Sequence, residues 1–186
     1  MAYTEKKFTN LNGIFSDKLT QAHLKLYSGY VANTNKSLEL LKTLEPGTPQ
    51  WAEVKRRLGW EFNGMRLHEL YFGNMGKNKK TLPKNSPLLK KIIETFGSEE
   101  ACRKDFVNTG KLRGIGWVAM YYDKEADELF NIWVNEHDVG HFAGCMPLLV
   151  MDVFEHAFIT DYGMDRASYI DAFINSIDWD IVSERF

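Results

Sequence analysis

The stretch Pro147-Leu-Leu-Val-Met-Asp-Val-Phe-Glu-His156 carries an aspartate at the end of an apolar run that is typical of a buried strand. An unpaired carboxylate is costly to bury, so Asp152 needs a cation or several hydrogen-bond donors. His156 follows four residues later and can offer a ring nitrogen to the same ion. The DxxxH spacing is a weak pattern alone, but here it predicts a strand that ends at a metal site.

Two further histidines lie on the inward faces of predicted helices. Apolar residues recur at helical spacing from Ser16 to about Leu44, and His23 falls on that apolar face. A second helix is expected from Pro49 to about Phe72, with His68 on its inward stripe. A lone inward histidine is more often an ordinary core residue. Two long helices joined by a short turn predict an antiparallel hairpin, however, and there the two histidines converge.

The expected metal ligands are therefore three imidazoles and one carboxylate, from His23, His68, Asp152 and His156. This donor set suits iron, manganese or zinc and does not suit calcium or magnesium. A zinc-protease HExxH helix is excluded because Phe72 stands where its second histidine is required. A di-iron centre lacks its pair of ExxH segments. His137 and His141 form a possible second pair, but they fall in a glycine-containing loop, which favours a surface or outer-sphere role.

The rest of the chain predicts an α+β fold. Two shorter helices are expected over residues 88–96 and 98–112, and a final helix over 165–176. Short apolar runs near 117–122, 129–134 and 147–153 predict a three-stranded, mainly antiparallel sheet. We expect a helical hairpin domain over residues 1–86 and an α/β domain over 87–186. Residues 73–87, including Lys77-Asn-Lys-Lys80, are interpreted as an exposed connection.

Composition narrows the class of function. The chain has 186 residues, of which 44% are hydrophobic, and its 23 basic and 25 acidic side chains give a formal charge of −2. Nothing in this balance favours nucleic acid or an anionic membrane as a partner, so a small substrate is expected. The polar N-terminus and the lack of a long apolar run indicate a cytoplasmic protein. Cys102 and Cys145 are expected to be free thiols.

From about Ser16 to its end, the chain resembles the iron/manganese superoxide dismutases. Asp152-Val-Phe-Glu-His-Ala-Phe158 is similar to the family's DVWEHAY signature, with phenylalanine where tryptophan and tyrosine are usual. Other segments similar to family motifs are Tyr30-Val-Ala-Asn-Thr-Asn35, Asn63-Gly-Met-Arg-Leu-His68, Gly114-Ile-Gly-Trp117, Arg166-Ala-Ser-Tyr169 and Asp178-Trp179.

The resemblance implies dismutation of superoxide by one iron or manganese ion per chain. It implies the same ligands, His23, His68, Asp152 and His156, with Tyr30 as a gateway residue near the substrate channel. Glu155 would bridge to a metal-binding histidine of a second subunit in a homodimer, and a tetramer is the alternative. An outer-sphere hydrogen-bond donor is often glutamine in the family. In the family this donor can come from either of two positions in the chain. Gly64 stands at the first position and has no side chain, so His137, at the second, is the candidate. We assign His137 a catalytic role together with Tyr30.

Departures from the family pattern motivate two other hypotheses. The spacing from His23 to Tyr30 is one residue shorter than usual, so we expect a π-type bulge of the first helix to be absent. The second channel histidine is replaced by Leu26 or Tyr27, and the tyrosine that pairs with it across the dimer is Ile159. A dismutase-like metal-binding protein with low or no turnover is therefore the main alternative, and a metal-dependent hydrolase is the second.

Overall fold

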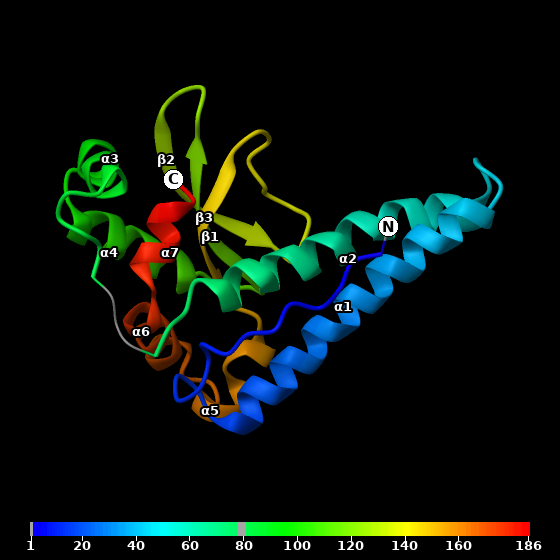
Figure 1. The fold of residues 1–186 in the computed structure, drawn as a ribbon, viewed down its shortest axis with the longest axis horizontal. Coiled ribbons are helices and arrows are strands. Elements are labelled where there is room, and N and C mark those ends of the chain that lie inside the picture. Colours follow the sequence, from blue (N-terminus) through cyan, green and yellow to red (C-terminus); the bar gives the residue numbers. More distant parts are fainter. Residues whose placement is uncertain (1, 78–80) are drawn as a thin grey trace.

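The computed structural model describes residues 2–77 and 81–186 of the chain (Figure 1). Its elements are α1 (Asp17–Thr43), α2 (Pro49–Gly73), α3 (Pro87–Phe96), α4 (Glu99–Gly110), β1 (Gly116–Asp123), β2 (Glu128–Asn135), β3 (Met146–Asp152), η1 (Glu155–Ala157), α5 (Ile159–Tyr162), α6 (Arg166–Ser176) and α7 (Trp179–Glu184).

The two long helices α1 and α2 run back along each other and extend to one side of the molecule (Figure 1). Ser16 caps α1 and Thr48 caps α2, since each side chain accepts a hydrogen bond from a backbone N–H in the first turn. Pro49 follows at the start of α2, where a missing backbone N–H costs nothing. The predicted hairpin is confirmed.

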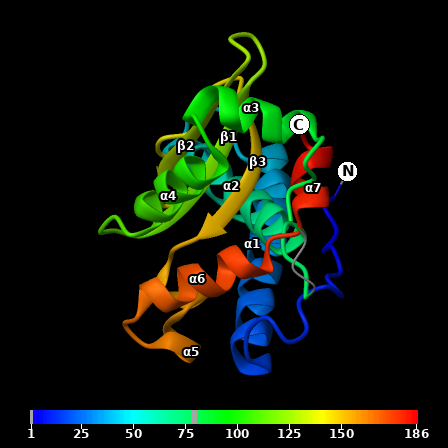
Figure 2. The same ribbon diagram turned by 90° about the vertical axis from the view of Figure 1, so that its left-hand side faces the viewer.

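A three-stranded antiparallel sheet with the order β2-β1-β3 forms the centre of the other half. The central strand β1 pairs Trp117 with Asp152 of β3 on one side and with Val134 of β2 on the other. Helix α2 packs against β3, α4 packs against β1 and β2, and α3 packs against β2. This packing brings the end of β3 to the inner part of the helical hairpin (Figure 2). The predicted α+β class and antiparallel sheet are confirmed, whereas the domain boundary after residue 86 stays a prediction.

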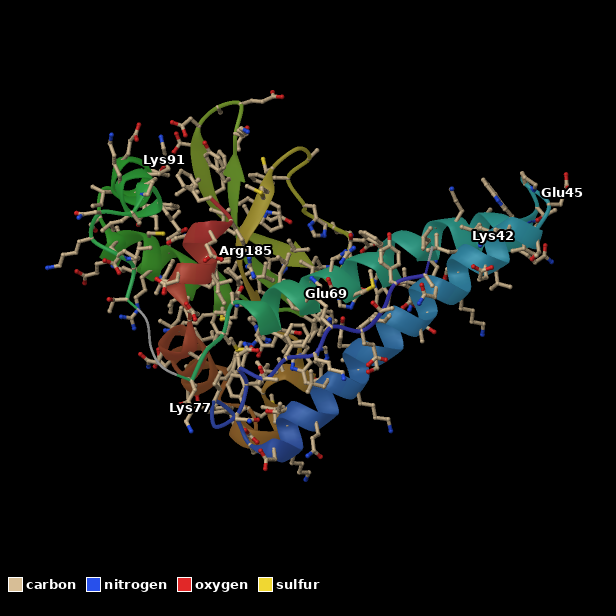
Figure 3. All side chains as sticks on the ribbon, viewed as in Figure 1. Lys42, Glu45, Glu69, Lys77, Lys91 and Arg185 are labelled. Atoms are coloured by element: carbon tan, nitrogen blue, oxygen red, sulfur yellow. The ribbon has the colours of Figure 1, made fainter. Side chains whose placement is uncertain are left out.

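The end of the chain folds back between the two halves. Arg185 follows α7 and donates hydrogen bonds to the backbone oxygen of Leu148 in β3 at 2.6 Å and of Leu70 in α2 at 3.3 Å. Figure 3 shows this side chain lying between α7 and the sheet. Arg185 thus links the hairpin to the sheet. The short elements η1, α5 and α7 were not predicted, because three to six residues are too few to show a helical period.

The expected exposed connection over residues 73–87 is partly wrong. Asn74, Met75 and Leu82 are buried. The Asn74 side-chain oxygen accepts the Val150 N–H at 3.0 Å, so the connection holds β3 instead of lying free. Residues 78–80 of this connection lie outside the described residues.

Two further expectations concern the cysteines and membranes. Cys102 and Cys145 are free, as predicted. In the part of the chain that the structure describes, no helix has both the length and the apolar character needed to span a bilayer.

Candidate metal centre

Helix α1 carries His23 and Tyr30 on its buried face. The helix is an α-helix throughout Asp17–Thr43, and seven residues make nearly two full turns, so both side chains point inward. His23 is 3% exposed and Tyr30 is 8% exposed. The expected absence of a bulge is confirmed, and His23 faces the other ligands despite its shorter spacing to Tyr30.

The segment that follows β3 supplies the other half of the site. Asp152 is the last residue of β3, and its backbone oxygen accepts the Tyr169 hydroxyl at 2.6 Å. Its Oδ1 accepts the Phe154 N–H at 2.8 Å, which leaves Oδ2 free to face the helices. The chain then turns through η1, and this turn returns His156 to the same carboxylate.

The four predicted ligands come together around the Oδ2 atom of Asp152. The Nε2 atoms lie 3.2 Å (His23), 3.6 Å (His68) and 3.1 Å (His156) from this oxygen. The four potential ligand atoms all lie within 4.8 Å of one another. Three of the four residues are buried, and His156 keeps 30% of its side chain exposed. Such a cluster has the size and donor types of a mononuclear iron, manganese or zinc site.

The position of the proton on the His68 ring shows whether a cation fits this cluster. Its Nδ1 lies 2.6 Å from the backbone oxygen of Gly64, a partner that only an N–H can satisfy. Nε2 is therefore a lone-pair acceptor, and no hydrogen-bond donor among the described residues reaches it. Two acceptors, His68 Nε2 and Asp152 Oδ2, thus face each other in a buried space. A bound cation removes this unfavourable arrangement, so the residues fit a metal ion.

Burial and charge put the ligands in the protonation states that metals require. Burial lowers the pKa of His23 and holds the pKa of His68 well below its usual value, so both imidazoles are neutral near pH 7. Burial alone would raise the pKa of Asp152. The electrostatic interactions and hydrogen bonds with His156 and His23 outweigh it, and the carboxyl pKa lies below its usual range. One anionic and two neutral donors are thus present before any ion binds.

Aromatic side chains, including Trp117 and Phe154, surround the ligands. The Trp117 ring lies edge-on to His68, with 4.9 Å between ring centroids. Phe154 stacks on His156 at 5.1 Å. These rings exclude water from two sides of the cluster and strengthen its electrostatic interactions.

His137 lies next to this cluster and is fully buried, although its loop suggested a surface position as one possibility. Its Nδ1 accepts a hydrogen bond from Trp117 Nε1 at 3.0 Å, so its proton is on Nε2. Nε2 lies 2.8 Å from the Tyr30 hydroxyl and donates to it. His141 does not join His137 in a second metal pair. Its Nδ1 accepts from the Tyr121 hydroxyl at 2.6 Å, and its Nε2 donates to the His137 backbone oxygen at 2.9 Å.

Gly64 allows Tyr30 to approach the second helix. A Cβ atom at Gly64 would lie 2.6 Å from a carbon of the Tyr30 ring, well inside van der Waals contact. The ring stacks on His68, with 5.1 Å between centroids. A glutamine at residue 64 is therefore incompatible with this position of Tyr30, which agrees with His137 as the outer-sphere group.

Comparisons with known proteins agree with this geometry. The family described as iron/manganese superoxide dismutases, C-terminal domain, matches residues 83–185. An iron superoxide dismutase of Aquifex aeolicus is 33% identical over 185 aligned positions, covering 95% of this chain and 86% of the relative. A manganese superoxide dismutase of Haloferax volcanii is 34% identical over 170 positions, covering 90% and 84%. The chain belongs to the iron/manganese superoxide dismutase family.

In this superoxide dismutase, His23, His68, Asp152 and His156 form the site for iron or manganese. Relatives named for either metal match at similar identity. The donor set agrees with both, because three imidazoles and one carboxylate accommodate an ion in two oxidation states.

A surface pocket of about 220 Å³ leads to Tyr30 from outside. Its lining residues are Leu26, Gly29, Tyr30, Asn33, Arg57, Trp60 and Glu61. Leu26 belongs to this lining, whereas Tyr27 is buried elsewhere and donates to Glu69 at 3.1 Å. Ile159 is exposed at the start of α5. Of the two candidates for the position of the channel histidine, Leu26 lines the pocket and Tyr27 does not, and the replacement itself stays a prediction.

Two residues of this pocket were missed by sequence reasoning. Trp60 lies with its ring centroid 4.4 Å from that of His137 and 5.5 Å from that of Tyr30. The Arg57 guanidinium lies over the Trp60 ring, 3.7 Å from its centroid. Their spacing of three residues on a helix was an available signal, because side chains at i and i+3 are neighbours.

Proposed function

We propose that Tyr30 and His137 hold and deliver protons while this superoxide dismutase converts superoxide to dioxygen and hydrogen peroxide. A bound iron or manganese ion would supply the one-electron chemistry, in which one superoxide is oxidised and a second is reduced. The second superoxide takes up two protons, so donors are needed next to the ligands. The observation that carries the proposal is the hydrogen-bonded series from Trp117 through His137 to Tyr30.

The protonation states of the two residues support this role. Burial, reinforced by the charge of Asp152, raises the pKa of Tyr30 far above its usual value, so the phenol keeps its proton. Burial lowers the pKa of His137 to about 4, so its ring is neutral near pH 7. His137 Nε2–H donates to the Tyr30 oxygen, which leaves the Tyr30 hydrogen free to point at a substrate in the pocket.

The missing channel pair favours a second candidate, a metal-binding protein with little or no turnover. Leu26 neither donates nor accepts a proton, so the pocket has lost one polar group. A metal-dependent hydrolase would need a non-redox ion at the same ligands. All three functions share the metal site and differ in the chemistry that follows binding.

An assay of superoxide decay with iron-, manganese- and zinc-loaded protein distinguishes these functions. We expect decay well above background with iron or manganese and none with zinc. Tyr30→Phe should lower kcat by about tenfold or more with unchanged metal content, because one positioned proton donor contributes about 100-fold or more in other enzymes. Tyr122→Phe, which removes a hydroxyl that donates to Asp127 and does not line the pocket, is the control. Background decay with every metal would overturn the proposal and favour the protein without turnover.

We also propose a homodimer in which Glu155 contacts the metal-binding His156 of a second copy, with a tetramer as the alternative. Glu155 is exposed and precedes His156, the one ligand that reaches the surface. A carboxylate on the outer nitrogen of a ligating imidazole orients it and strengthens its donor character. Light scattering should give twice the chain mass for the wild type and a smaller mass for Glu155→Ala. A monomeric wild type would contradict the dimer.

A further inference from the structure

Arg57 is an exposed residue of α2 whose side chain is nevertheless held in one place. Its Nε donates to Glu61 Oε1 at 2.9 Å, and its guanidinium plane lies over the Trp60 ring. The Glu61 carboxylate is itself buried and also lies near the Asn33 amide, 3.4 Å away. Two different contacts thus fix the guanidinium at the mouth of the pocket above Tyr30.

The hydrogen-bonding capacity of Arg57 is only partly used. Nε is occupied by Glu61, but no described residue accepts a hydrogen bond from its two terminal amino groups. Among the described residues that line the pocket, Arg57 is the only cation. Free N–H donors on a fixed guanidinium are well suited to bind a small anion.

The other described charged side chains around the pocket mouth are negative, so Arg57 decides whether an anion is attracted there. Glu61 lines the pocket, and Glu136 accepts a hydrogen bond from Trp60 Nε1 at 3.2 Å. The chain as a whole carries a formal charge of −2. Without Arg57, an approaching anion would meet two carboxylates and no positive group among the pocket's described lining residues. Superoxide is a monoanion near neutral pH, so this charge balance acts directly on the substrate.

The position of Arg57 also connects the surface to the ligands. Its guanidinium packs on Trp60, Trp60 contacts Tyr30, and Tyr30 stacks on the ligand His68. An anion held by the free amino groups of Arg57 would therefore stand at the outer end of this series. Tyr30, at its inner end, carries the proposed proton donor.

We propose that Arg57 captures the incoming superoxide anion at the pocket mouth and guides it towards Tyr30. This inference rests on the proposed function, since it concerns how the substrate of that reaction arrives. Arg57 is a positioning residue in this scheme. Its contribution is electrostatic, so salt should weaken it: the screening length falls from about 30 Å at 0.01 M ionic strength to about 3 Å at 1 M.

The test measures kcat/KM for superoxide against ionic strength in the metal-loaded protein. We expect Arg57→Gln to lower kcat/KM by about tenfold at low salt, the lower end of known steering effects. The difference from wild type should vanish at high salt. Arg57→Lys should recover part of the loss because it keeps the charge, and Arg57→Glu should reverse the sign of the salt dependence. A merely structural role would not reverse that sign.

Arg56→Gln is the matched control. Arg56 is the neighbouring residue and pairs with the exposed Glu53 outside the pocket, so its removal changes the net charge equally. We expect wild-type kcat/KM and salt dependence for this variant. If Arg56→Gln and Arg57→Gln lose the same activity, only the overall charge matters and the inference is wrong.

Azide, a small monoanion, gives a readout that does not depend on turnover. Calorimetric titration at low salt should show weaker azide binding by several-fold for Arg57→Gln and no change for Arg56→Gln. If the wild type does not consume superoxide but Arg57→Gln still binds azide more weakly than the wild type, the proposed function is refuted. Arg57 then remains an anion-binding residue. If the wild type is active and Arg57→Gln equals it in both azide binding and kcat/KM, the role of Arg57 is refuted while the proposed function stands.

Discussion

The metal ligands, called the inner site below, and the pocket mouth around Arg57 and Trp60 both involve α1 and α2. Different interactions hold the side chains of the two regions in place. His68 and Asp152 are fully buried, and each has its remaining polar atoms fixed by the backbone. Trp60 lies about two turns and Arg57 about three turns before His68 on α2, where solvent reaches the side chains. The inner site depends on desolvated donors that must all be present, whereas the mouth depends on a charge that water and salt screen.

This difference predicts how each region responds to substitution. Removing a metal ligand leaves buried polar atoms without partners, so we expect metal binding to be almost completely lost. Losing a charge at the mouth changes an encounter rate by a modest factor that depends on ionic strength. Tyr30 belongs to both regions, because it lines the pocket and stacks on His68.

The largest expected effect is at the inner site. Asp152→Ala removes the single anionic ligand, and only neutral imidazoles remain to hold a divalent or trivalent ion. We expect the purified variant to retain almost no iron or manganese by elemental analysis. Asp171→Ala, at an exposed position of α6, should retain wild-type metal content. Metal content unaffected by Asp152→Ala would contradict the assigned site.

An intermediate effect is expected at His137, between the two regions. Its pKa of about 4 lies below the value near 6.5 of an unfolded histidine, so the unfolded state binds more protons between these pH values. The stability contributed by neutral His137 is present above about pH 6.5 and is lost as the pH falls towards 4. The loss amounts to about 3 kcal/mol of unfolding free energy.

Urea unfolding of the wild type and of His137→Gln at pH 7 and pH 4.5 measures this contribution. Glutamine does not titrate, so the wild type should lose more stability on acidification than the variant. The metal-binding histidines are common to both proteins, and their titration cancels in the comparison. An identical loss in the two proteins would show that His137 is not kept neutral by burial.

Sequence reasoning succeeded where buried polar residues interrupt an apolar pattern. His23, His68 and Asp152 stand out for that reason, and the hairpin that joins the first two follows from helical spacing and a short turn. The roles expected for His137 and Glu155 required the family resemblance, because neither local pattern distinguishes them from ordinary loop residues. Their catalytic and interface roles stay predictions.

The pocket mouth escaped prediction for a physical reason. Arg57 and Glu61 have the spacing of an ordinary surface ion pair, and an arginine on a solvated helix face carries no separate signal. Only the structure places Trp60 beneath Arg57 and against His137. From the sequence, Gly64 indicated only that the outer-sphere donor is absent from that position. The structure shows that the lack of a side chain at Gly64 makes room for the Tyr30 ring.

The smallest expected effect compares two glycines of α2. Gly64→Ala would bring a methyl group within 2.6 Å of the Tyr30 ring, which is held by stacking on His68 and by the hydrogen bond from His137. Gly59→Ala meets no atom within 4 Å. Alanine favours a helix over glycine by about 1 kcal/mol, and overpacking costs about 1–3 kcal/mol. We therefore expect Gly59→Ala to gain about 1 kcal/mol in unfolding free energy and Gly64→Ala to lose about 1 kcal/mol. Urea unfolding at pH 7 measures both changes, and a similar gain in the two variants would mean that Tyr30 moves aside without cost.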